Sequence, residues 1–213
     1  EMGMNHFGEI EYLSRLTRPT VALITNAGEA HLAGVGSLEG VARAKGEIFT
    51  GLRTAGTAVL NADDQFFPLW RTLVGNHRCL TFGLDAKADV SAQYRLTDSG
   101  SLIHLTTTTH GDIDMRVPLL GRHNVMNTLA GAGAAIAAGA SLEQVKTGLE
   151  KLRTVSGRLE VKPGISGARI IDDTYNANPA SVAAGLQVLK EFKGERVLVL
   201  GDMGELGPSA ADI

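Results

Sequence analysis

Residues 172–179 carry the densest set of side chains that could do chemistry: two carboxylates, one aromatic ring and two carboxamides. They follow the apolar run 168–171, which predicts a buried strand, and precede residues 180–190, which predict a helix. Ligands in open α/β sheets bind at the carboxyl ends of strands. Asn178 and Pro179 also suit the N-cap and first turn of a helix, so a capped loop with solvated acids explains the stretch about equally well.

Three further places carry side chains that bind metal ions or phosphates in other proteins. Residues 1–10 contain two glutamates, a histidine and an asparagine between glycines, although such composition is more often a solvated loop. His31 follows a strand predicted over residues 20–26, where a lone histidine is more often a hydrogen-bonded surface residue than a ligand. Lys45 lies at the edge of the apolar face of a helix predicted over residues 37–49. Its ammonium either extends to water or has a pKa shifted by burial.

Composition and charge limit the classes of protein to which the chain can belong. Of its 213 residues, 44% are hydrophobic and 20% are charged, as in ordinary globular proteins. The net charge of −3 argues against a general nucleic-acid binder or membrane-surface binder. Cys79 is the single cysteine, which excludes an internal disulfide and predicts a reducing, cytoplasmic compartment. The sequence has no apolar run near the roughly 18 residues of a membrane span.

The elements that must position these residues alternate between strands and helices. Apolar runs at residues 20–26, 57–60 and 78–82 predict strands, with helices between them, and such alternation is typical of a parallel sheet. Residues 88–118 contain three alternating runs separated by turn signals, which predicts an appended antiparallel meander. Residues 196–200 predict another buried parallel strand.

A long helix of small residues is predicted from residue 119 to about residue 139. Asn124 and Asn127 lie three residues apart and therefore share one face near its start. Residues 153–157 have the composition of a domain junction. We therefore expect an α/β protein with two units, residues 1–153 and residues 154–213.

Seven segments, taken together and in this order, resemble the Mur ligase family of ATP-dependent enzymes that form amide bonds in peptidoglycan synthesis. They are residues 1–10, 26–31, 44–49, 121–124 with Asn127, 157–158, 172–179 and 201–207. One segment alone is a weak signal, whereas the ordered set spans nearly the whole chain and is highly specific.

The resemblance implies a mostly parallel central ATP-binding domain at residues 1–153 and the first part of a Rossmann-like C-terminal domain at residues 154–213. The phosphate-loop motif Gly-x-x-x-x-Gly-Lys-Ser/Thr is absent from the sequence. Residue 1 is glutamate and opens directly into motif-like residues. We therefore expect an internal segment of a longer ligase, inactive alone, without the phosphate loop and the domain that binds the UDP-sugar.

The implied reaction uses ATP and Mg²⁺. A substrate carboxylate attacks the γ-phosphate to give an acyl phosphate, and an amine then displaces the phosphate. Residues 172–179 and 201–207 favour the family member that joins D-alanyl-D-alanine to UDP-N-acetylmuramoyl-tripeptide. The resemblance also implies a cytoplasmic monomer with no nucleic-acid or membrane partner. Two alternatives stay open: a Mur-type ligase with another amino-acid donor, and a nucleotide-binding module without catalysis.

Residue by residue, the resemblance implies a magnesium and adenine site in the first unit. Glu1 and His31 are expected to bind magnesium. Lys45 is expected to be catalytic as a carbamate, whose two oxygens suit Mg²⁺ better than an ammonium would. Asn124 and Asn127 are expected at the adenine, since carboxamides both donate and accept hydrogen bonds.

The second unit is expected to complete the nucleotide site. Arg158 is expected to be catalytic at the phosphates, Asp173 to accept from the ribose hydroxyls, and Tyr175 to lie near the nucleotide. Asn176 and Asn178 are expected to orient the loop or the acceptor amine. ATP would then lie between the two units, and catalysis would require closure about residues 153–157.

Overall fold

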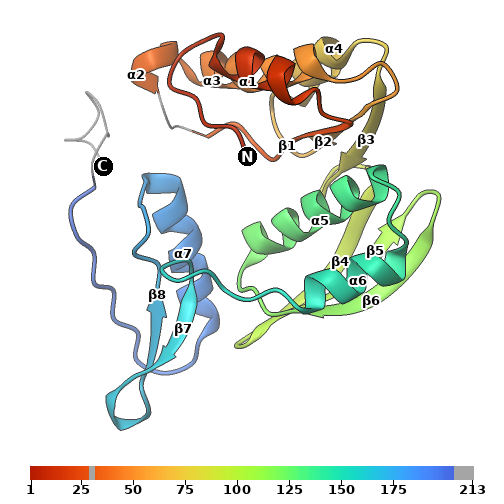
Figure 1. Ribbon diagram of the computed structural model, residues 1–213. Helices are drawn as coiled ribbons and strands as arrows, with labels where there is room; N and C mark the ends of the chain where they lie inside the picture. Colours follow the sequence, from red (N-terminus) through yellow and green to blue (C-terminus); the bar gives the residue numbers. More distant parts are fainter. Residues whose placement is uncertain (29–31, 204–213) are drawn as a thin grey trace.

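The computed structural model describes residues 1–28 and 32–203. Its main feature is a six-stranded sheet in the order β1-β2-β3-β4-β5-β6 (Figure 1). The strands are β1 Val21–Ile24, β2 Thr57–Asn61, β3 Arg78–Phe82, β4 Val90–Thr97, β5 Gly100–Thr107 and β6 Gly111–Val117. The first three pair in parallel, a single parallel pair joins β3 to β4, and the last three form an antiparallel meander. The predicted sheet and meander are both confirmed.

Helices cover both faces of this sheet, and alternate residues of each strand enter two different cores. The covering helices are α3 Leu38–Gly46, α4 Phe67–Val74, α5 Arg122–Ala137 and α6 Leu142–Glu150, and the short α2 Leu32–Val35 packs against α3. Val59 of β2 packs in the core under α5, whereas Ala58 and Leu60 pack in the core under α3 and α4. This alternation follows from the period of two in a strand and makes β2 buried on both faces.

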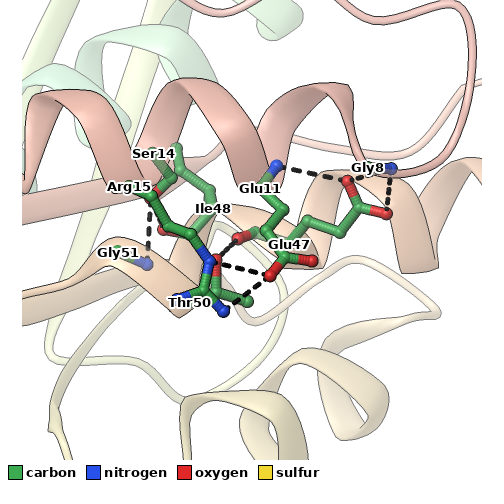
Figure 2. Close-up of polar contacts among 8 residues, drawn as sticks. All are labelled: Gly8, Glu11, Ser14, Arg15, Glu47, Ile48, Thr50 and Gly51. Atoms are coloured by element: carbon green, nitrogen blue, oxygen red, sulfur yellow. Dashed lines mark hydrogen bonds and ion pairs between the residues drawn. The ribbon is translucent and has the colours of Figure 1, made fainter.

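A helix that the sequence pattern does not predict, α1 (Glu9–Thr17), packs against the 3-10 helix η1 (Glu47–Gly51). The Glu47 carboxylate accepts hydrogen bonds from the Gly8 N–H at 2.9 and 3.0 Å, at the N-terminus of α1 (Figure 2). The fully buried Ser14 hydroxyl bonds to two backbone groups of η1. Tertiary contacts therefore stabilise a helix whose sequence alone is ambiguous.

The second unit is a two-stranded antiparallel hairpin followed by a helix. Its elements are β7 Glu160–Pro163, η2 Ile165–Gly167, β8 Arg169–Asp172 and α7 Pro179–Glu191. Asn178 caps α7 and Pro179 occupies its first turn, as predicted. The prediction of a buried strand at residues 168–171 is wrong in its burial, because Ile170 is 52% exposed. Among the described residues, α7 covers only the face of the hairpin that carries Ile171.

Residues 196–200 were predicted as a buried parallel strand, and this prediction is wrong: the segment is neither paired nor buried. Val199 is 91% exposed and Val197 is 71% exposed. A strand forms only where a neighbouring edge supplies hydrogen-bond partners. Within the described ranges the segment pairs with no other strand, so its apolar pattern stays exposed.

The two units meet through a small apolar cluster at the start of α5. Leu120 packs with Leu159, Val188 and Phe192 in this cluster. Nearby, an Arg169 guanidinium nitrogen lies 2.9 Å from an Asp98 carboxylate oxygen in the β4–β5 turn. The contact area therefore joins the meander and α5 to the hairpin and α7.

Candidate active site

Asp64 joins the loops that follow two neighbouring parallel strands. One oxygen of its carboxylate accepts from the Ala27 N–H after β1 at 3.0 Å. The other accepts from the Phe66 N–H after β2 at 2.8 Å. The carboxyl ends of β1 and β2 are thus fixed side by side, at the edge of a parallel sheet where ligands bind.

Lys45, in the last turn of α3, is half-buried and lies close enough to Asp64 to interact with its charge. Burial lowers the pKa of the Lys45 ammonium, and the negative charge of Asp64 opposes that shift. A lowered pKa increases the fraction of neutral amine, which is the form that reacts with CO₂ or another electrophile. The structure therefore favours the reactive lysine over one that extends freely into water.

Asp63, next along the chain, organises the loop after β3. Its carboxylate accepts hydrogen bonds from the backbone N–H groups of Leu84 at 2.6 Å, Asp85 at 3.1 Å and Ala86 at 2.7 Å. Asp85 in turn lies 2.6 Å from a guanidinium nitrogen of Arg122, the first residue of α5. The loop that Asp63 holds is therefore tied to the start of the helix that carries the two asparagines.

Asn124 and Asn127 lie together on the first turns of α5, as their spacing predicts. The Asn127 side-chain nitrogen donates to the Asn124 side-chain oxygen at 3.3 Å. Asn124 also donates to the Leu120 carbonyl at 2.8 Å, which fixes its orientation. Asn127 is exposed, so its carboxamide is accessible to a ligand.

His123, the residue before Asn124, is half-buried where α5 meets α7. Gly121 makes room for it: a Cβ at Gly121 would lie 2.8 Å from the imidazole and 2.6 Å from a Val188 methyl group. Burial lowers the pKa of the imidazole, and the charge of Asp173 acts in the opposite direction. The imidazole therefore lies next to the asparagine turn and within range of a charge of the second unit.

In the second unit, Arg158 and Tyr175 form one pair. The Arg158 guanidinium carbon lies 4.1 Å from the centre of the Tyr175 ring, a cation–π contact. The Tyr175 N–H donates to the Gly157 carbonyl at 3.0 Å, which holds the two segments together. Both side chains are exposed, so the guanidinium can still meet an anion.

The remaining predicted residues of this loop are engaged in local structure. Asp173 accepts from the Leu159 N–H at 3.1 Å, and Leu159 has a left-handed backbone with φ of 50°. Asn176 accepts from the Ala177 N–H at 2.9 Å. The Asn178 oxygen is used in capping α7, through the Ser181 N–H at 2.9 Å. These contacts orient the loop.

The predicted magnesium ligands are only partly visible. Glu1 is exposed, and His31 lies outside the described residues. Within residues 1–28 and 32–203, the histidine, cysteine, aspartate and glutamate side chains form no group of three or more that could hold a metal ion. Among the described residues, Lys45 and Asp64 are therefore the charged side chains that identify the candidate site at the carboxyl ends of β1 and β2.

Two family models match the chain, one on each side of residues 136–156. Residues 1–135 match the Mur ligase middle domain, and residues 157–213 match the Mur ligase glutamate ligase domain. The chain belongs to the Mur ligase family. Within the described ranges, no helix is both long enough and apolar enough to cross a membrane.

Relatives within the Mur ligase family match both units. The UDP-N-acetylmuramoyl-tripeptide--D-alanyl-D-alanine ligase of Escherichia coli is 45% identical over 97% of this chain and 46% of its own length. The Bacillus subtilis ligase of the same name is 40% identical over 97% of this chain and 44% of its own length. The chain thus spans about half the length of the curated relatives it matches.

Solved structures agree with this assignment. A crystal structure of MurF from Acinetobacter baumannii has a TM-score of 0.93 and 39% identity, and covers 99% of this chain and 46% of its own. MurF from Thermotoga maritima in complex with ADP has a TM-score of 0.86 and 26% identity, over 100% of this chain and 48% of its own.

Three residues of this candidate site were not singled out from the sequence: Asp63, Asp64 and His123. The two aspartates follow the predicted strand at residues 57–60, so the strand-end argument used for residues 172–179 would have found them. His123 gave no such signal, because the group that acts on its charge, Asp173, lies in the second unit, far away along the chain.

Proposed function

We propose that this chain is the ATP-binding part of a ligase that joins D-alanyl-D-alanine to UDP-N-acetylmuramoyl-tripeptide through an acyl phosphate. The observation that carries the proposal is 45% identity with the Escherichia coli ligase of that name over 97% of the chain. That identity extends over nearly the whole chain and therefore over both units. Activity is proposed for a protein of the relatives' length that contains this chain.

Lys45 fits a carbamate that holds Mg²⁺. Its burial favours the neutral amine, and it lies close enough to Asp64, at the carboxyl ends of β1 and β2, to interact with its charge. A carbamate would place two anionic oxygens there, and Mg²⁺ prefers oxygen ligands. Glu1 and His31 are proposed as the other ligands. When bound, the ion would neutralise phosphate charge during phosphoryl transfer.

The other polar groups are proposed to position ATP. Asn127, oriented through Asn124, would read the edge of the adenine. Arg158, stacked on Tyr175, would donate to the phosphates and stabilise the charge that develops in transfer. Asp173 would accept from the ribose hydroxyls.

Asn176 and Asn178 are proposed to act indirectly, by shaping the loop that meets the acceptor amine. Their side-chain oxygens already accept local backbone hydrogen bonds. We place the boundary between the units at residues 153 and 154, inside the stretch between α6 and β7 that forms neither helix nor strand. The ligase is proposed to be a cytoplasmic monomer without a nucleic-acid or membrane partner.

The test is phosphate release from ATP by the ligase that contains this chain. Release should require both UDP-N-acetylmuramoyl-tripeptide and D-alanyl-D-alanine. Lys45→Ala should lower turnover by at least about 100-fold, since a missing charge-stabilising group costs that order, and a short-chain carboxylic acid should restore part of it. Lys87→Ala, an exposed lysine in the loop after β3, is the control and should be unaffected.

The same assay separates the alternatives. Release that another amino acid stimulates in place of D-alanyl-D-alanine would indicate a Mur-type ligase with a different donor. Nucleotide binding without any substrate-dependent release would indicate a binding module. A fully active Lys45→Ala variant would remove Lys45 from the site while leaving the ligase assignment intact.

A further inference from the structure

A groove lined by three arginines lies at the amino ends of β1 and β2, whereas Lys45 and Asp64 lie near their carboxyl ends. Its volume is about 760 Å³, and Arg15, Arg18 and Arg53 line it together with residues 50–52 and 54–55. Arg18 precedes β1 and Arg53 precedes β2, whereas the candidate active site follows the carboxyl ends of these strands. The length of the parallel strands therefore separates the two places.

The backbone around this arginine groove is fixed by specific contacts. Ser14, fully buried, accepts from the Gly51 N–H at 3.2 Å, which fastens α1 to η1 and so joins two walls of the groove (Figure 2). Arg18 has a left-handed backbone with φ of 47°, and its N–H donates to the Ser14 carbonyl at 2.8 Å. The Arg53 Nε donates to the Arg18 carbonyl at 3.0 Å.

The charges in the groove do not cancel. Arg15 is paired with Glu11 at 2.6 Å. The Glu47 carboxylate is occupied by backbone N–H groups at the start of α1. In the described part of the chain, no carboxylate pairs with Arg18 or with Arg53.

One ordinary explanation is that these arginines complement the negative end of the α1 dipole. It accounts for the Nε of Arg53, which binds a carbonyl. It leaves the terminal nitrogens of Arg18 and Arg53 without a protein acceptor among the described residues. Thr54 and Ala55 also line the groove, and their backbone N–H groups likewise have no acceptor among the described residues. Guanidinium forks with free backbone N–H groups are the donors that phosphate oxygens accept from.

A second hollow of about 650 Å³ adjoins the arginine groove and shares Thr50 and Thr54 with it. Phe49 and Leu73 line it with apolar surface. His77 also lines this hollow, and its buried Nδ1 has no hydrogen-bond partner within the described ranges. A ligand that extends from the groove would therefore meet the apolar walls that Phe49 and Leu73 supply.

We propose that the arginine groove binds the phosphate group of a small, soluble phosphate ester whose apolar part lies in the adjoining hollow. Two guanidinium groups and two backbone N–H groups match the several oxygens of a phosphate better than those of a single carboxylate. Such a ligand would bind without competing with a nucleotide at the Lys45 edge. This site is independent of the ligase reaction.

Calorimetric titration of the full chain with phenyl phosphate tests the proposal. The wild type should bind it, and Arg18→Gln/Arg53→Gln should weaken binding at least tenfold, because the charge-assisted hydrogen bonds are lost. Arg95→Gln, an exposed arginine on β4, is the matched control and should bind as the wild type does. Unchanged affinity in the double variant, or no wild-type binding up to about 10 mM ligand, would overturn the site.

Two further measurements test whether the ligand is an ester rather than inorganic phosphate, and whether it is soluble rather than a lipid headgroup. Phenyl phosphate should bind more tightly than inorganic phosphate and should shift the NMR signals of Leu73 and His77; equal affinity would overturn the role of the hollow. Phosphatidylcholine vesicles with phosphatidic acid should not sediment the protein. If the wild type sediments with the vesicles and the double arginine variant does not, the ligand would be a lipid headgroup, and the proposal of a soluble ester would be overturned.

Binding that persists at wild-type affinity in Lys45→Ala would support an independent site. Loss of phenyl phosphate binding in Lys45→Ala would instead place the ligand at the nucleotide site and overturn the proposal. Because neither readout uses ligase turnover, failure of the ligase proposal would leave this result interpretable.

Discussion

At the scale of single residues, short acidic side chains after β2 hold the candidate active site in place. Asp64 fixes the loop after β1, and Asp63 fixes the loop after β3. Each uses both carboxylate oxygens on backbone N–H groups, which a longer side chain could not reach in the same way. Near these carboxylates, Lys45 is the side chain whose pKa is lowered by burial.

Asp63→Ala should destabilise the chain by about 1–3 kcal/mol, because it leaves three backbone N–H groups without an acceptor. Urea denaturation would measure the free energy of unfolding. Gln65→Ala is the control, since Gln65 is exposed in the same loop. A loss no larger than that of the control would mean that Asp63 does not hold the loop after β3.

At the scale of elements, the start of α5 is where two helices and a hairpin meet. The left-handed Gly121, with φ of 88°, allows α7 to approach the first turn of α5 closely. His123, next to this close approach, is half-buried, and burial disfavours the charged form of its imidazole. Burial therefore lowers the pKa of a residue adjacent to the asparagine pair.

This geometry predicts a pH dependence of stability. The pKa of His123 is lower in the folded chain than its ordinary value near 6.5, so the unfolded chain binds the proton more readily. The contribution of His123 is therefore complete above about pH 6.5 and is lost as the pH falls through its lower folded-state pKa.

Urea denaturation at several pH values between about 7 and 5 would measure this effect. His123→Gln should reduce the fall in the free energy of unfolding over that range, because glutamine does not titrate. An identical pH dependence in the variant would show that other groups cause the loss.

At the scale of the whole molecule, the proposed nucleotide site is divided between two units joined near Gly157. Gly157 has φ of 73°, and a Cβ there would lie 3.1 Å from the Tyr175 backbone nitrogen. The junction therefore sets the position of the Arg158–Tyr175 pair relative to the first unit. We expect turnover to be sensitive to this backbone position.

Gly157→Ala should lower kcat/KM for ATP at least tenfold in the ligase, because the added methyl group displaces Tyr175 and with it Arg158. Gly111→Ala is a matched control: Gly111 also has a positive φ, of 86°, but open space around its Cβ position. Both variants should lose about 1 kcal/mol of stability from backbone strain. Equal kinetics in the two variants would argue against a positional role for Gly157.

The pattern of residues determined the local elements and the family. Alternation and turn residues predicted β2, β3 and the meander, because these features depend on neighbours in sequence. Asn178 forms the predicted cap of α7 for the same reason. Local patterns could not predict α1, since it depends on Ser14 and Glu47 bonding across more than thirty residues.

The tertiary structure determined which residues are neighbours in space. The sequence placed Lys45 at the edge of a helix, but only folding brought it close to Asp64 and lowered its pKa. The sequence made residues 196–200 apolar enough for a strand, but no partner edge pairs with them in the described chain. Strand pairing, burial and charge proximity join residues distant in sequence, so a local pattern can suggest them but only the folded chain determines them.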